Sequence, residues 1–111
     1  MKKIAPYTFR LLAASALLLS MNGAAQAQDK ATVLHNRATA AMCANCHGTE
    51  GRTVEGSAIP SLVGMPKDYM ILQMKAFKDG SRPATVMHQI TKGLTDAQID
   101  TIANYYAATK R

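Results

Sequence analysis

The chain has 111 residues, with 13 Lys and Arg against 7 Asp and Glu, a formal charge of +6. This length allows one small domain, so it excludes Rossmann enzymes, TIM barrels and two-domain enzymes with a cleft between their halves. Three of the basic residues lie within the first 27, and the other 10 are spread among the acidic residues. We therefore expect no binding of nucleic acid.

The N-terminus has the three parts of a secretory signal peptide. A basic segment without acids, residues 2–10, precedes the apolar run 11–21, and a pattern of small residues ends at Ala27. We expect cleavage after Ala27, which removes residues 1–27 and leaves residues 28–111 as one domain in the periplasm. The apolar run is about half as long as a membrane span. We expect no membrane span after cleavage, and an uncleaved anchor is the alternative.

The first half of the mature chain predicts one helix and one long loop. Lys30–Cys43 is rich in Ala, and Asp29 is a suitable N-cap for a helix there. Residues 45–65 contain four glycines and Pro60 and show no lasting periodicity. Loops of this length in small domains are usually functional.

The second half predicts two more helices. Pro66 suits the first position of a helix that Gly80 would end, and residues 81–93 look irregular. Thr95 and Gln98 form a capping box at the start of the last helix. Four residues of that helix recur on one face: Ile99, Ile102, Ala103 and Tyr106. No convincing strand pattern is present, so we expect an all-α domain of 3–5 helices with long loops.

The segment Cys43-Ala44-Asn45-Cys46-His47 carries the chemistry. C-x-x-C-H is the attachment signature of c-type haem. Two thiols at this spacing reach the two vinyl groups of the porphyrin and form thioether bonds. His47 is then brought under the iron as the proximal ligand. One covalently bound haem c is therefore the expected cofactor, and it would supply the apolar core that so short a chain lacks.

Three other uses of the two cysteines compete with haem attachment. A thioredoxin-like dithiol needs a βαβ context, which the sequence lacks. A zinc site would have to recruit His35 or His88 as a fourth ligand. A disulfide between Cys43 and Cys46 would close a loop too short to stabilise the fold much.

The second axial ligand separates an electron carrier from an enzyme or a gas sensor. Met87 is our choice, because it lies 40 residues after His47 in the irregular stretch before the last helix. His88, Met65 and an open sixth position remain alternatives. Met70 and Met74 share a helical face with Phe77, which is more typical of core packing. Met/His ligation raises the reduction potential.

With these motifs, the sequence resembles the class I cytochromes c, in particular the short bacterial forms with one haem. The resemblance extends over nearly the whole mature chain. It is carried, in order, by residues 43–49 (CANCHGT), 59–64 (IPSLVG), 69–80 (YMILQMKAFKDG) and 86–95 (VMHQITKGLT).

The resemblance implies the cytochrome c fold, with N- and C-terminal helices that cross beside the haem. It supports Met87 as the distal ligand, and it places Pro60 where the family uses a proline carbonyl to accept the Nδ1–H of the proximal histidine, here His47. It implies a carrier of single electrons that cycles between Fe(III) and Fe(II) and is not itself an enzyme. Its partners would be redox proteins.

A closer similarity is to the cytochrome subunits of flavocytochrome c sulfide dehydrogenases, which receive electrons from a flavoprotein. The alternative function is therefore that of an obligate subunit bound to such a flavoprotein. Five basic residues would either steer an acidic partner or be ordinary solvated charges: Lys67, Lys75, Lys78, Arg82 and Lys92.

Overall fold

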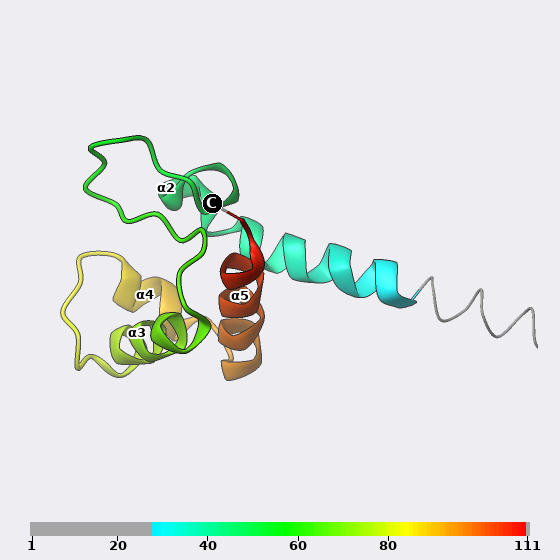
Figure 1. The fold of residues 1–111 in the computed structure, drawn as a ribbon. Coiled ribbons are helices and arrows are strands. Elements are labelled where there is room, and N and C mark those ends of the chain that lie inside the picture. Colours follow the sequence, from blue (N-terminus) through cyan, green and yellow to red (C-terminus); the bar gives the residue numbers. More distant parts are fainter. Residues whose placement is uncertain (1–27, 111) are drawn as a thin grey trace, which may run out of the picture. The chain divides into compact units, whose positions relative to one another are not determined.

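The computed structural model describes residues 28–110, which contain helices, turns and loops and no strand (Figure 1). This confirms the expected all-α class. The chain divides into two units, residues 1–34 and 35–111. None of the helices in the described part of the chain is long and apolar enough to cross a membrane. The predicted signal peptide, residues 1–27, lies outside the described residues.

Residues 28–41 are helical, and a turn at residues 42 and 43 follows. The first predicted helix therefore exists but ends two residues earlier than expected. The prediction that Asp29 is its N-cap was wrong, because Asp29 has helical structure and an N-cap residue lies outside the helical conformation.

The predicted loop over residues 45–65 contains two short helical turns. Helix α2 (Ala44–His47) includes its first residues, and the 3-10 turn η1 (Thr49–Gly51) follows directly. The remainder, from residue 52 to residue 65, is irregular as expected. A single turn is too short to show a helical period, so the sequence pattern did not reveal α2.

Helix α3 (Lys67–Asp79) begins one residue later than predicted, because Pro66 is its N-cap and has extended backbone. Gly80 ends it in the left-handed conformation with φ 85°, as predicted. Such a conformation strains a residue that has a Cβ atom.

Helix α4 (Met87–Lys92) lies within the segment that was expected to be irregular. Its N-cap Val86 provides no side-chain hydrogen bond, so the usual start signal is missing. Helix α5 (Asp96–Ala108) follows, and both hydrogen bonds of its predicted capping box are present: Thr95 Oγ1 accepts from Gln98 N at 3.2 Å, and Gln98 Oε1 accepts from Thr95 N at 2.9 Å.

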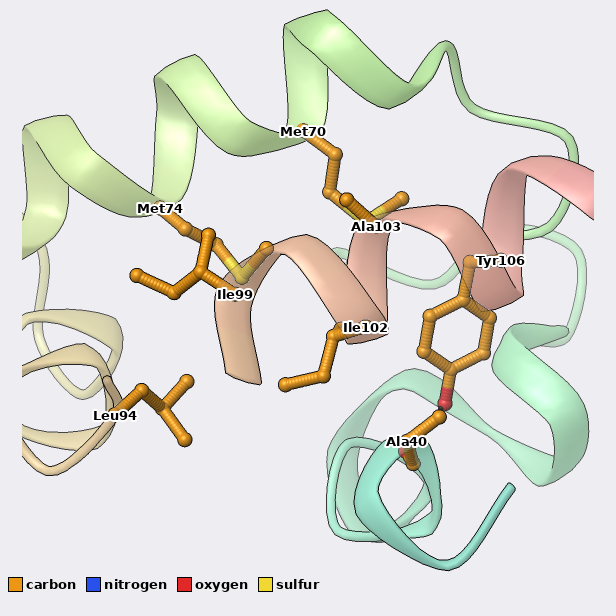
Figure 2. Close-up of a cluster of buried hydrophobic side chains, with 8 residues drawn as sticks. All are labelled: Ala40, Met70, Met74, Leu94, Ile99, Ile102, Ala103 and Tyr106. Carbon is orange, nitrogen blue, oxygen red and sulfur yellow. Dashed lines mark hydrogen bonds between the residues drawn. The ribbon is translucent and has the colours of Figure 1, made fainter. Parts of the chain in front are cut away.

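Helix α3 packs against both α4 and α5. The core lies mainly between α3 and α5, where Met70 and Met74 point toward the buried face of α5 (Figure 2). This confirms that these two methionines are core residues. The α5 residues predicted to share one face are all buried: Ile99, Ile102, Ala103 and Tyr106.

Candidate functional site

The pentapeptide from Cys43 to His47 folds into one helical turn. Cys43 is the N-cap of α2, and its carbonyl accepts hydrogen bonds from Cys46 N at 3.3 Å and from His47 N at 2.9 Å. Residues three and four apart lie on the same side of a helix, so Cys43 lies next to Cys46 and next to His47 on this turn. Cys43 is half-buried and Cys46 is exposed, and neither forms a disulfide.

The His47 imidazole is held by the loop that follows it. His47 is 8% exposed, and its Nδ1 lies 2.8 Å from the carbonyl oxygen of Pro60. With the proton on Nδ1, this nitrogen donates to Pro60 and leaves the lone pair of Nε2 available for a metal. The structure thus joins two of the predicted site residues that lie 13 positions apart.

Gly51 brings Pro60 to His47 by closing the intervening loop. Its carbonyl oxygen accepts hydrogen bonds from Leu62 N at 2.8 Å and from Ser61 Oγ at 2.8 Å. A Cβ atom at Gly51 would lie 2.6 Å from the Tyr106 ring. Only glycine therefore allows the backbone to approach α5 so closely, and the base of the loop is fixed at this point.

Met87 opens α4 and is half-buried. Its carbonyl oxygen accepts a 2.8 Å hydrogen bond from the hydroxyl of Thr91, a fully buried residue one turn later. His88, its rival in the sequence, has a buried Nδ1 with no hydrogen-bond partner among the described residues. Met65 packs against the hydrophobic core.

Several apolar side chains on the loops around these residues are exposed. Val54 is 80% and Ile59 is 39% exposed in the loop that carries Pro60, while Val86 is 53% and Ile90 is 38% exposed beside Met87. Exposed apolar side chains mark binding sites for apolar ligands where they lie together. Together with the two thiols and the available imidazole nitrogen, they fit a large apolar group such as haem.

Cys43 also contacts the C-terminal helix. Burial raises the pKa of the Cys43 thiol, and a hydrogen bond with Tyr106 offsets part of this effect. Burial likewise raises the pKa of the Tyr106 phenol well above its usual range, with a smaller contribution from the nearby Cys43. Both groups are therefore neutral at physiological pH.

No three His, Cys, Asp or Glu side chains within residues 28–110 are grouped so that they could hold a metal ion. Cys43 and Cys46 are not joined by a disulfide, and the same residues include no strand.

A family model described as "Cytochrome c" matches residues 36–110, which is more than half of the chain. The chain belongs to the cytochrome c family. It contains one C-x-x-C-H motif, so this cytochrome has one covalently bound haem c and carries single electrons without transforming a substrate.

Curated relatives support this assignment. This cytochrome is 38% identical over 103 residues to the cytochrome subunit of sulfide dehydrogenase of Chlorobaculum tepidum. The aligned region covers 86% of this chain and 92% of that protein. It is 34% identical to cytochrome c4 of Pseudomonas aeruginosa, over 91% of this chain and 49% of the relative. A thiosulfate dehydrogenase electron acceptor of Thiomonas intermedia is 38% identical, over 64% of this chain and 33% of the relative. The cytochrome thus spans half or less of the last two proteins.

Three of the five basic residues singled out as docking candidates are paired with carboxylates of α5. Lys67 Nζ lies 2.8 Å from Asp100, and two lysines share Asp96, Lys75 at 3.9 Å and Lys78 at 3.2 Å. These pairs reduce the positive charge that the α3 surface offers to a partner. The Arg82 guanidinium lies over the Phe77 ring of α3, and Lys92 has no charged partner in the described part of the chain.

The sequence patterns did not point to the residues that support the site indirectly. Thr91 and Gly51 belong to this group, as do the exposed apolar residues Val54 and Ile59. The sequence contained one signal for the apolar residues: large apolar side chains occur in segments without helical or strand periodicity. Side chains in such segments are otherwise expected to be exposed to solvent.

Proposed function

We propose that Cys43 and Cys46 attach the haem of this electron carrier and that His47 and Met87 bind its iron on opposite faces. In each attachment, a thiol S–H adds across a vinyl double bond, so no oxidant is needed. The observation that carries the proposal is the 2.8 Å contact between His47 Nδ1 and Pro60 O, which orients a metal-binding nitrogen on the turn that also carries both thiols.

The bound haem supplies the Fe(III)/Fe(II) couple. The protein residues hold it, set its potential and limit the access of water. A hydrogen bond from Nδ1 of His47 to Pro60 makes the imidazole a stronger donor and fixes its ring. A thioether such as that of Met87 is a neutral, soft ligand, which favours Fe(II) and raises the potential.

Met87 is preferred to His88 as the distal ligand because of its place at the start of α4. Its backbone is held by Thr91, and two apolar side chains beside it, Val86 and Ile90, are exposed. Ile90 lies one turn after Met87 on the same side of α4, so an apolar group that covered Ile90 would lie beside Met87. A ligand in this position in both oxidation states would also keep peroxide and oxygen from the iron.

We further propose that residues 1–27 are a signal peptide cleaved after Ala27 and that the mature domain works in the periplasm. The family match begins at residue 36, so the proposed signal lies outside the matched residues. Its composition, with a basic start, an apolar middle and small residues at the end, supports export.

The donor that we propose is an oxidoreductase that acts on an inorganic sulfur compound. Two relatives carry names of this kind, a cytochrome subunit of sulfide dehydrogenase and a thiosulfate dehydrogenase electron acceptor. The second candidate function is that of an obligate subunit of such an enzyme, bound to a flavoprotein. Size-exclusion chromatography from the native source separates the two, because a free carrier elutes as a small protein.

Visible spectra of the purified holoprotein test the ligand assignment. The oxidised wild type should show the sulfur-to-iron charge-transfer band near the red end of the spectrum. Met87→Ala should abolish this band, and the matched control His88→Ala should retain it. Holoprotein with a Soret band but no charge-transfer band in the wild type would favour His88 over Met87, loss of the band in His88→Ala alone would contradict the assignment, and material without a Soret band would refute haem attachment.

A further inference from the structure

The segment that leads from α3 to Met87 is attached to the rest of the domain at one end. Arg82 N donates to Ala76 O at 3.0 Å, and Ser81 N donates to the Asp79 carboxylate at 2.8 Å. Pro83 has no N–H, and within the described part of the chain no backbone N–H from residue 84 to residue 86 donates to a backbone carbonyl. Arg82 is therefore the last residue before Met87 whose backbone N–H is hydrogen-bonded, and the next backbone bonds are those of Val86 O within the first turn of α4.

The Arg82 side chain strengthens this attachment. Its guanidinium lies over the ring of Phe77, with Cζ 4.5 Å from the ring centroid, and it donates a hydrogen bond to Gln73 Oε1. Gln73 and Phe77 are one turn apart on α3, so both present the same side of the helix to the guanidinium. A planar cation that stacks and donates at once is a specific property of arginine.

The helix that receives this contact is itself fixed. Met70 and Met74 are 3% and 6% exposed in the core between α3 and α5. The anchor of the segment is thus rigid, while the four residues between Arg82 and Met87 have only their own stiffness and α4 to hold them.

We propose that Arg82 is a positioning residue for the distal ligand: clamped on Gln73 and Phe77, it restrains the segment that keeps Met87 at the iron. The inference rests on the proposed role of Met87. For Met87 to leave the iron, the segment before it has to move, and a clamped segment is displaced less often. The apparent affinity of a competing ligand is proportional to the population of protein that can accept it. A clamp that makes this population smaller therefore weakens the binding of the competing ligand.

Imidazole is the probe, because it competes for the sixth position of the oxidised holoprotein. In Arg82→Met, we expect imidazole to bind about tenfold more tightly than in the wild type, since a stack and a charged hydrogen bond are lost. The charge-transfer band of Met ligation should persist without imidazole. Lys92→Met removes the same charge from α4, where it has no charged partner among the described residues, and should change imidazole binding by less than roughly twofold.

A double-mutant cycle separates the clamp from a general effect of charge. Gln73→Leu keeps Arg82 and should show part of the increase in imidazole affinity. The double variant Gln73→Leu with Arg82→Met should bind imidazole only slightly more tightly than Arg82→Met alone. Arg82→Lys keeps the charge but lacks the planar guanidinium, so its imidazole affinity should lie between those of the wild type and Arg82→Met. Gln73→Leu also tests the clamp if Arg82→Met fails to fold.

The outcomes distinguish this inference from the proposed function. A wild type without the charge-transfer band would refute Met87 ligation itself. A wild type with the band, combined with unchanged imidazole affinity in Arg82→Met and Gln73→Leu, would overturn only the role of Arg82. Equal gains in Arg82→Met and Lys92→Met would also overturn it, because the effect would then come from charge.

Discussion

The hydroxyl of Tyr106 donates a 2.8 Å hydrogen bond to the carbonyl oxygen of Ala40, a residue 66 positions earlier (Figure 2). Both residues are almost fully buried, and Cys43, three residues after Ala40, lies close enough to Tyr106 to share in this contact. The C-terminal helix is thereby tied to the residues that lead into the C-x-x-C-H turn. Packing of α5 thus holds the start of the candidate haem site.

The first prediction concerns the pH dependence of this contact. Burial raises the pKa of the Tyr106 phenol in the folded state well above its usual range. The unfolded chain ionises near pH 10, so the stability due to this phenol is complete below pH 10 and falls as the pH rises beyond it.

Tyr106→Phe should therefore lower the free energy of unfolding by about 1 kcal/mol at pH 8, for one lost hydrogen bond. The cost is moderate because Ala40 O keeps a 3.1 Å hydrogen bond from Cys43 N. The gap between the wild type and the variant should shrink by about 1 kcal/mol at pH 11, as measured by denaturant unfolding of the holoprotein. A gap that widens at high pH would contradict the buried neutral phenol.

The second prediction separates close packing at Gly51 from its backbone conformation. Gly51 and Gly56 both have φ 78°, but a Cβ atom at Gly51 meets the Tyr106 ring at 2.6 Å, whereas nothing lies within 4 Å of one at Gly56. Gly56→Ala should cost about 1 kcal/mol for conformation alone. Gly51→Ala should cost roughly 3 kcal/mol because overpacking is added. Thermal unfolding of both holoproteins checks this, and equal losses would show that the contact with Tyr106 relaxes freely.

Local signals in the sequence predicted the start of α5 and the end of α3. The capping box of Thr95 and Gln98 needs only residues three apart, and the left-handed Gly80 follows from its position after a helix. Both features are determined by short-range geometry. The attachment pentapeptide is likewise contiguous, so its chemistry could be recognised without knowledge of the fold.

Helix α4 and the contacts around it could not be predicted in this way. Six residues are too few to show a period, and α4 is held by packing against α3. The contact of His47 with Pro60 followed only from a family resemblance. The stacking of Arg82 on Phe77 and the pairing of Lys78 with Asp96 depend on tertiary structure, and no periodicity in the chain records them.

The third prediction compares two lysines that share one carboxylate. Lys78 Nζ donates to Leu94 O at 2.7 Å and to Asp96 at 3.2 Å, whereas Lys75 lies 3.9 Å from Asp96 and is more exposed. Lys78→Met should destabilise the domain by about 1–2 kcal/mol, because a charged hydrogen bond to a backbone carbonyl is lost. Lys75→Met should cost less than about 0.5 kcal/mol. Denaturant unfolding measures both, and similar costs would mean that the carbonyl contact contributes little.

The fourth prediction tests which part of Pro60 serves His47. The atom 2.8 Å from Nδ1 is the backbone carbonyl oxygen of Pro60, and Pro60→Ala keeps this acceptor. The variant should lose about 0.5 kcal/mol of stability through a more flexible unfolded chain, with almost no change in reduction potential. The Nδ1 proton of His47 should stay protected from exchange in NMR spectra of the reduced protein. Ser61→Ala removes a 2.8 Å bond to Gly51 O that closes the same loop, so it should accelerate this exchange. If Pro60→Ala lost the protection in a stable fold, the proline ring and not its carbonyl would be the group that holds His47.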